Sequence, residues 1–179
     1  MATLPFPQNK LVARMALVEQ HVGFENQHDL DGVIDTFGAT AEYQDSPWAE
    51  QYHGRDEVRR FYTQLMKALP DLSIEIVRRH VAEETIVLEV MIRGTHRGTW
   101  RGLLPTGRKL ELPLCGVYTF DGDDRLAGER IYYDRGTVLR QLGVFHEPDS
   151  FLGRIMTAVS HPITITKSLI RTVLGSSGK

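Results

Sequence analysis

A carboxylate near the end of one expected strand carries the clearest chemical potential in this 179-residue chain. An alternating strand puts Arg130, Tyr132 and Asp134 on one face. Desolvation among tyrosine and aliphatic side chains disfavours the charged form of a carboxylate, which raises its pKa toward useful basicity. This pattern makes Asp134 a candidate general base. In the alternative interpretation, Asp134 pairs with Arg130 or Arg135, or caps the helix that follows.

Two further polar residues, His96 and Tyr118, lie on neighbouring expected strands. Each also has a structural interpretation, His96 as an ordinary strand-end residue and Tyr118 as part of the core. Aromatic side chains beside loops, Trp48 and Trp100, close a pocket or cover a hydrophobic edge. The turn-rich segment 45–54, which also carries Tyr52 and His53, is therefore expected to line a pocket.

Several common chemistries find no support in the sequence. The chain has no phosphate-binding glycine motif, no His-Glu-x-x-His and no Gly-x-Ser-x-Gly elbow. Its seven histidines include no pair spaced by two or four residues, and its one cysteine, Cys115, excludes an internal disulfide. We therefore expect no metal and no organic cofactor.

The composition of the chain limits the kinds of partner that we expect it to bind. With 21 basic and 23 acidic residues the formal charge is −2, so no global positive field favours nucleic acid. No uncharged stretch reaches the roughly 20 apolar residues of a membrane-spanning helix. Residues 1–10 lack the basic start and apolar run of a secretory signal. The sequence therefore predicts a cytoplasmic protein that does not span a membrane.

Helical spacing of apolar residues recurs in the first part of the chain. Leu11 to Val22 follow one helical stripe, and Asp29 is placed to cap a short second helix that Gly38 ends. The third stripe begins at Arg55 and stops before Pro70, which cannot donate a backbone hydrogen bond. Three helices are thus expected before residue 71.

Beyond Asp71 the apolar period changes to two, which indicates strands. A further short strand is expected at 41–44. Short connections make neighbouring strands antiparallel. Helices followed by a curved antiparallel sheet give an α+β fold. The four successive strands are expected around residues 74–76, 86–92, 110–114 and 130–134.

The last part of the chain differs from the rest. After a helix around Leu139 and Leu142, two helical stripes separated by Pro162 precede a flexible Gly-Ser-Ser-Gly-Lys end. We expect a domain over 1–143 and a helical extension over 144–179. The extension is expected to bury its apolar faces on the pocket mouth or on a second subunit.

Three stretches in this order resemble one known family. They are Tyr52-His-Gly-Arg-Asp-Glu-Val-Arg-Arg-Phe-Tyr62 running to Leu69-Pro-Asp71; Arg93-Gly-Thr-His-Arg-Gly98 with Leu104-Pro-Thr-Gly-Arg108; and Glu129-Arg-Ile-Tyr-Tyr-Asp134 with Leu139-Arg-Gln-Leu-Gly143. From Phe37 to Gly143 the sequence resembles SnoaL-like polyketide cyclases of the nuclear transport factor 2-like superfamily. The resemblance implies a cone-shaped sheet around three helices and an apolar pocket, usually in a homodimer.

The resemblance also implies a reaction. In these cyclases an Asp at the end of the last strand removes a proton α to a carbonyl without a metal or organic cofactor, and the enolate closes a ring by an aldol step. Asp134 matches that position, and Tyr118 or His96 would donate a hydrogen bond to the enolate oxygen. The candidate residues for binding a hydrophobic small-molecule substrate are Tyr43, Trp48, Tyr52, His53, Phe61, Trp100, Arg130 and Tyr132.

Other functions remain open because the same fold also serves isomerases, dehydratases, epoxide hydrolases and non-catalytic binders. Epoxide hydrolases of this superfamily use an Asp-Arg-Asp set, and Arg93-Gly-Thr95 lacks the second carboxylate. A protein that only binds a lipid-like or polyketide-like ligand is the main alternative. A buried Asp134 would favour the enzyme, and an Asp134 ion-paired at the surface would favour the binder.

Overall fold

The computed structural model describes residues 8–82 and 84–176. The chain forms two compact units, one ending at Leu142 and the other beginning at Gly143. Residues 1–10, which lack the features of a secretory signal, lie mainly outside the described residues. The flexible end expected from Gly175 begins inside a helix, and its last three residues also lie outside them.

The first unit contains the three expected N-terminal helices. The side chain of Asp29 accepts a hydrogen bond from the backbone N–H of Gly32 at 2.9 Å, which confirms the predicted cap of the second helix. That helix ends at Thr36, because Phe37 already belongs to a strand. The helices of this unit are α1 (Gln8–Gln27), α2 (Leu30–Thr36), α3 (Gly54–Ala68) and α4 (Arg135–Gln141).

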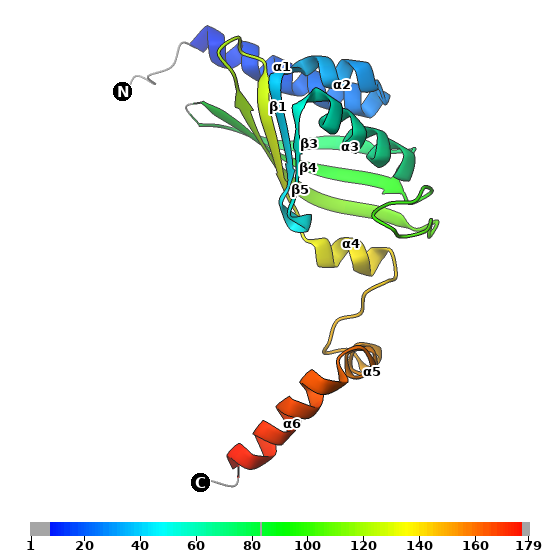
Figure 1. The fold of residues 1–179 in the computed structure, drawn as a ribbon. Coiled ribbons are helices and arrows are strands. Elements are labelled where there is room, and N and C mark those ends of the chain that lie inside the picture. The colour runs from blue at the N-terminus through cyan, green and yellow to red at the C-terminus, as the bar shows by residue number, and fades with distance from the viewer. Residues whose placement is uncertain (1–7, 83, 177–179) are drawn as a thin grey trace. The chain divides into compact units, whose positions relative to one another are not determined.

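One curved sheet forms the rest of the unit (Figure 1). The four predicted strands are present as β3 to β6, and each pairs antiparallel with the next. The short predicted strand is longer than expected and pairs parallel with β6. Across the sheet, the strands lie in the order β2-β1-β6-β5-β4-β3. Along the chain they are β1 (Phe37–Asp45), β2 (Glu50–His53), β3 (Ser73–Ala82), β4 (Thr85–Thr95), β5 (Lys109–Phe120) and β6 (Leu126–Tyr132).

The segment 45–54 is more ordered than the expected loop. A short 3₁₀ turn, η1 (Ser46–Trp48), follows β1, and β2 then pairs antiparallel with β1. Residues 50–53 belong to a turn-rich segment, so their own sequence does not predict a strand. Their pairing with β1 makes them one. The chain reversal brings Trp48 close to the end of β1.

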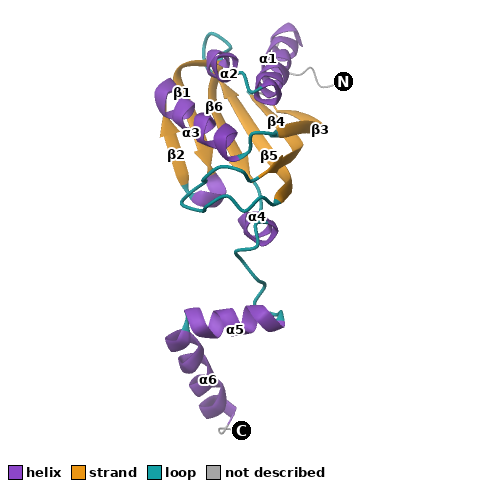
Figure 2. Cartoon of the chain, turned by 90° about the vertical axis from the view of Figure 1, so that its right-hand side faces the viewer, coloured by secondary structure: helices purple, strands orange, loops and turns teal. Residues whose placement is uncertain are grey.

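The concave face of the sheet packs on α1, α2 and α3 (Figure 2), which is the α+β arrangement that the sequence predicts. One core cluster joins these helices to the sheet, and Val18, Val33, Val58, Tyr62 and Leu88 are fully buried in it. A second cluster connects the end of α3 to α4. It comprises Ala68, Leu69, Leu72, Leu110, Leu112, Val138 and Leu142.

Alternation along β6 decides which side chains face the helices. Glu129 and Ile131 are buried, whereas Arg130 and Tyr132 are exposed on the outer face. The strand ends at Tyr132, two residues earlier than expected. The inner face therefore carries a carboxyl group that the sequence reasoning did not single out.

The second unit contains α5 (Phe151–Ser160) and α6 (Pro162–Ser176), separated at the expected Pro162. The Ser150 side chain caps α5 by accepting a hydrogen bond from the backbone N–H of Gly153 at 3.0 Å. None of the described helices combines the length and apolar character needed to cross a bilayer.

A glycine contact tests the packing between α3 and the loop that follows β4. A Cβ atom on Gly98 would lie 2.2 Å from the carbonyl oxygen of Lys67, and nothing lies within 4 Å of one on Gly23 in α1. Gly98→Ala should therefore lower the free energy of unfolding by about 1–3 kcal/mol. Gly23→Ala should raise it by up to about 1 kcal/mol. Urea unfolding of both variants checks this, and an unchanged midpoint for Gly98→Ala would contradict the packing.

Candidate active site

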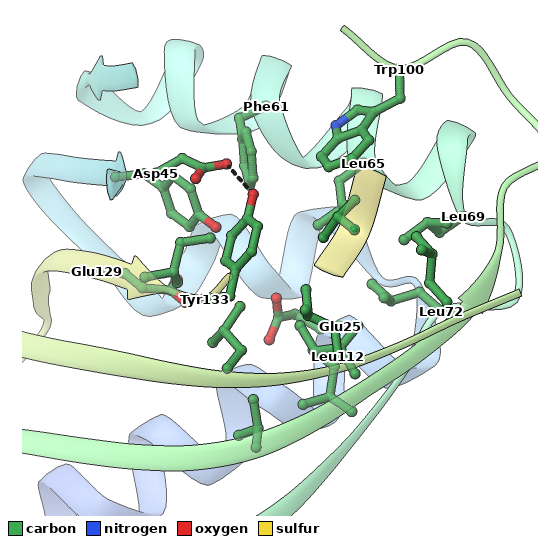
Figure 3. Close-up of a pocket in the computed structure, with 18 of the residues that line it drawn as sticks. Glu25, Asp45, Phe61, Leu65, Leu69, Leu72, Trp100, Leu112, Glu129 and Tyr133 are labelled. Carbon is green, nitrogen blue, oxygen red and sulfur yellow. Dashed lines mark hydrogen bonds between the residues drawn. The ribbon is translucent and has the colours of Figure 1, made fainter. Parts of the chain in front are cut away.

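A cavity lies between the helices and the inner face of the sheet (Figure 3). It holds about 730 Å³ of space not filled by atoms, its open mouth included. Most of the wall is aliphatic, so the cavity suits a hydrophobic ligand. The apolar lining consists of Phe61, Leu65, Leu69, Leu72, Ile74, Val90, Ile92, Trp100, Leu110, Leu112, Leu114, Ile131 and Val138.

Polar groups interrupt this apolar wall. Glu25 comes from α1, Asp45 from the end of β1 and Glu129 from β6. The three carboxyl-bearing side chains are at most 5% exposed. Buried carboxyl groups need hydrogen-bond or charge partners, so these partners define what the cavity can do. The polar lining is completed by Tyr43, Tyr118 and Tyr133.

Beneath the cavity floor, His21 lies between two hydroxyl groups. Its Nδ1 is 2.7 Å from the Thr36 hydroxyl, which itself donates to the carbonyl oxygen of Val33 at 2.6 Å. Its Nε2 is 3.0 Å from the Tyr62 hydroxyl, which itself donates to Glu129 at 2.6 Å. Since each hydroxyl proton is already used, both ring nitrogens must donate. This arrangement requires His21 to be an imidazolium cation.

Two carboxyl groups face this buried cation. The Nε2 atom of His21 is 3.3 Å from Glu129 and 3.9 Å from Glu25. Burial alone would lower the pKa of His21, but its hydrogen bond to Glu129 and the charge of that carboxylate outweigh burial and raise it, and Glu25 adds to the rise when it is ionised.

One cation beside two carboxyl groups leaves one acid without a full counter-charge. Burial raises the pKa of Glu25 to about 8, the cation at His21 works against this rise, and the negative charge of Glu129 adds to it. Glu25 is therefore mostly a neutral carboxylic acid at pH 7, and its carboxyl group reaches into the cavity (Figure 3). Protonated, it can donate a hydrogen bond to a ligand oxygen.

The mouth of the cavity holds a different carboxylate. Oδ2 of Asp45 accepts hydrogen bonds from Arg101 at 2.6 Å and from the Tyr133 hydroxyl at 3.1 Å. Oδ1 is buried and has no hydrogen-bond partner among the described residues. Burial raises the pKa of Asp45, and the nearby Glu50 adds to the rise, while Arg101, Tyr133 and the Trp48 backbone oppose it.

A tight turn positions Arg101. Trp100 and Leu103 exchange backbone hydrogen bonds of 3.0 and 2.9 Å across it. The two central residues both have positive φ, 51° at Arg101 and 78° at Gly102, as in a type I′ turn. The Arg101 guanidinium lies 4.7 Å from the Trp48 ring and 5.1 Å from the Trp100 ring, and it also pairs with Glu50. These contacts fix it against Asp45.

The structure corrects the expectation for Asp134. Its side chain is 63% exposed, does not line the cavity, and accepts hydrogen bonds from the backbone N–H groups of Gly136 and Thr137 as the cap of α4. The Thr137 hydroxyl and the Gly136 N–H lower its pKa instead of raising it. The alternative interpretation, a helix cap with an ion pair to an arginine, is the one observed, although the partner is Arg140. This position of Asp134 favours a binding protein over an enzyme that uses Asp134 as its base.

The two expected donors separate in space. Tyr118 is buried and lines the cavity, where burial and the charge of Glu129 raise its pKa well above the usual value. His96 is also buried but does not line the cavity. Its Nδ1 accepts a hydrogen bond from the Thr106 N–H at 3.2 Å, and burial lowers its pKa. Only Tyr118 is in reach of a ligand there.

The expected substrate-binding residues fall into three groups. Some line the cavity, and others line a second hollow beside its mouth. The remainder are exposed because they point outward from β2 and β6. The cavity includes Tyr43, Phe61 and Trp100, the mouth hollow includes Trp48 and Tyr52, and His53, Arg130 and Tyr132 are exposed on the surface.

Four buried titratable residues of the site were not singled out from the sequence, namely His21, Glu25, Asp45 and Glu129. A signal was present in the helical stripe of α1, where His21 and Glu25 are spaced by four residues among Val18 and Val22. Polar residues inside an apolar stripe are either paired or functional. For Asp45 and Glu129, strand alternation alone places them inward with Tyr43 and Ile131, but the strand boundaries had to be known first.

In the part of the chain that the structure describes, no group of three or more histidine, cysteine, aspartate or glutamate side chains is arranged to hold a metal ion.

The curved sheet around three helices is the fold of ketosteroid isomerase-like and nuclear transport factor 2-like proteins, which solved structures share. A family model described as SnoaL-like polyketide cyclase matches residues 15–142. The chain thus belongs to the SnoaL-like polyketide cyclase family. A search of the curated proteins found no match.

Solved structures resemble the chain in fold at low sequence identity. AclR, a putative hydroxylase from Streptomyces galilaeus, is 22% identical with a TM-score of 0.66, over 76% of this chain and 88% of that one. A putative SnoaL-like polyketide cyclase from Jannaschia sp. CCS1 is 16% identical with a TM-score of 0.66, over 79% and 96%. SalBIII, an epoxide hydrolase/cyclase-like enzyme of pyran ring formation in salinomycin, is 16% identical with a TM-score of 0.60, over 69% and 92%.

The raised pKa of Glu25 predicts a pH-dependent stability. Folded Glu25 keeps its proton at pH values where the unfolded chain has lost it, so the free energy of unfolding falls as pH rises from about 4.5 through about 8. The slope is at most about 1.4 kcal/mol per pH unit. Glu25→Gln cannot titrate and should lack this contribution.

Urea unfolding at pH 5, 6, 7 and 8 measures the difference between wild type and Glu25→Gln. Glu19→Gln makes the same chemical change on an exposed part of α1 and should behave like wild type. Parallel pH profiles for wild type and Glu25→Gln would show that Glu25 is not the protonated group.

Proposed function

We propose that this protein is a cofactor-free enzyme that removes a proton next to a carbonyl group of a hydrophobic compound and so promotes ring closure. Asp45 is the base, and protonated Glu25 is the hydrogen-bond donor. The observation that carries the proposal is the unpartnered Oδ1 of Asp45, buried at an apolar cavity that also contains a neutral acid.

Asp45 has the properties of a general base. Its Oδ2 is held by Arg101 and Tyr133, so the carboxylate keeps one orientation while Oδ1 remains free to accept a proton. Burial raises its pKa and so increases its basicity. Arg101 keeps the group ionised despite burial. Opposing influences of this kind give a base that is charged yet weakly solvated.

Glu25 supplies the opposite function. As the α-proton leaves, negative charge develops on the carbonyl oxygen, and a neutral hydrogen-bond donor in a water-poor cavity stabilises it. A protonated carboxyl group meets this requirement, and Tyr118 provides a second hydroxyl in the same cavity. Environments that push two carboxyl groups toward different protonation states are typical of acid and base pairs.

Ring closure follows from the same groups. Asp45 takes the α-proton, and the enolate carbon then bonds to a second carbonyl carbon of the same molecule. The oxygen of that second carbonyl becomes an alkoxide and receives the proton that Asp45 took, which restores the Asp45 carboxylate, so the atoms balance without an oxidant or reductant. The aliphatic walls would hold a flexible chain folded and bring the reacting carbons together. The family assignment supports this class of reaction, and the cavity residues rather than the fold support the assignment of roles.

Asp45→Asn tests the base. We expect cyclic and polyketide-like ketones that raise the melting temperature of wild type to stabilise Asp45→Asn as well, because the cavity walls are unchanged. Exchange of the ketone α-proton for deuterium, followed by NMR, should fall by about 10²- to 10⁴-fold in the variant.

Asp134→Asn is the matched control, since Asn also caps helices and the residue is outside the cavity. It should exchange the α-proton at the wild-type rate. Equal behaviour of wild type and Asp45→Asn, with binding but no exchange, would withdraw the enzymatic proposal and identify a binding protein. Loss of exchange in Asp134→Asn alone would return the role of base to that residue.

A further inference from the structure

The helical extension carries a surface that the cavity chemistry does not use. In α5 the large apolar residues lie on one side, within an arc of about 140° in helical projection. Gly153, Arg154, Thr157 and Ser160 occupy the other side. The apolar side chains are exposed, among them Phe151 at 82% and Val159 at 72%.

Helix α6 repeats this division over a longer segment. Ile163, Leu169 and Ile170 lie on its apolar side, and Ile163 is 70% exposed. Lys167 and Arg171 are four residues apart and border this apolar side, at about 40° and 80° from Ile163 in helical projection. The two helices leave these apolar side chains uncovered, so burying them requires another surface.

The charge of the two helices indicates which kind of surface would cover them. Residues 151–179 contain four basic residues and no acidic residue, whereas residues 1–150, which include Glu147 and Asp149 just before α5, contain 17 basic and 23 acidic residues. Two copies of residues 151–179 would therefore repel one another. An anionic surface would attract it, and each Lys or Arg near such a surface adds to binding.

The first unit offers no equivalent apolar patch among its described residues. Its exposed large apolar side chains are spread over α1, β3, β6 and a loop, as Val12, Val77, Val81, Tyr132 and Leu104. A lipid interface does not require a matching groove, because an amphipathic helix buries its apolar side among acyl chains and keeps basic residues at the headgroups.

We propose that residues 151–176 lie in the interface of an anionic lipid bilayer and hold the protein at that surface. At 10 and 15 residues, α5 and α6 are too short to span a bilayer but suit a position parallel to its plane. The apolar sides supply the hydrophobic contact, and Arg154, Lys167 and Arg171 supply the attraction to headgroups.

Vesicle co-sedimentation of the full chain tests the proposal. We expect binding to vesicles of phosphatidylcholine mixed with phosphatidylglycerol, little binding to phosphatidylcholine alone, and release as salt is raised. The double variant K167E/R171E should bind the mixed vesicles at least tenfold more weakly. The matched control R55E/R59E makes the same charge change on α3 of the first unit and should retain more binding than K167E/R171E.

Other outcomes would overturn the proposal. Absence of binding to both kinds of vesicle would do so, as would equal weakening in the two double variants. A mass in light scattering that doubles with concentration, without vesicle binding, would assign the helices to an interface between copies. A melting temperature for K167E/R171E equal to that of wild type shows that the first unit remains folded.

Discussion

The buried charge of His21 is the interaction on which the rest of the site depends. Both ring nitrogens donate, to Thr36 in α2 and to Tyr62 in α3, and the cation faces Glu129 in β6. One side chain of α1 thus ties two further helices and the central sheet together. Because an unpaired ion is costly in an apolar interior, removing any partner would destabilise the others. The same constraint leaves Glu25 without a full counter-charge, and so a requirement of folding creates a neutral acid in the cavity wall.

In the proposed reaction, two carboxyl groups of the cavity take opposite roles. At the floor, burial raises the pKa of Glu25 to about 8, and Glu129, which already balances the cation, adds to this rise. At the mouth, Asp45 is paired with Arg101, which a tight turn and two tryptophan rings hold in place. Aliphatic side chains between these ends keep the local dielectric low and strengthen both effects. Acid and base character here arises from neighbours, not from residue type.

The sequence predicted the elements better than the site. The stripe in α3 and the alternation in β3 to β6 are strong periodic signals, and those elements formed as expected. The strand β2 was missed because pairing with β1, rather than local preference, makes residues 50–53 extended. The misplacement of Asp134 has a related cause. Alternation puts Asp134 on the same face as Arg130 and Tyr132, and that face proved to be the exposed outer one. In addition, β6 ends two residues before Asp134, which caps α4 instead.

By itself, the sequence determined the α+β class, the three helices and most of the sheet, because hydrophobic periodicity is a local property of the chain. It also determined the amphipathic and basic character of residues 151–176. Only the tertiary structure decided which carboxyl groups share the cavity and which are protonated. A pKa depends on burial and on charges within a few ångströms, and α1, β1 and β6, which supply Glu25, Asp45 and Glu129, are far apart in the sequence and meet only when the sheet closes over the helices.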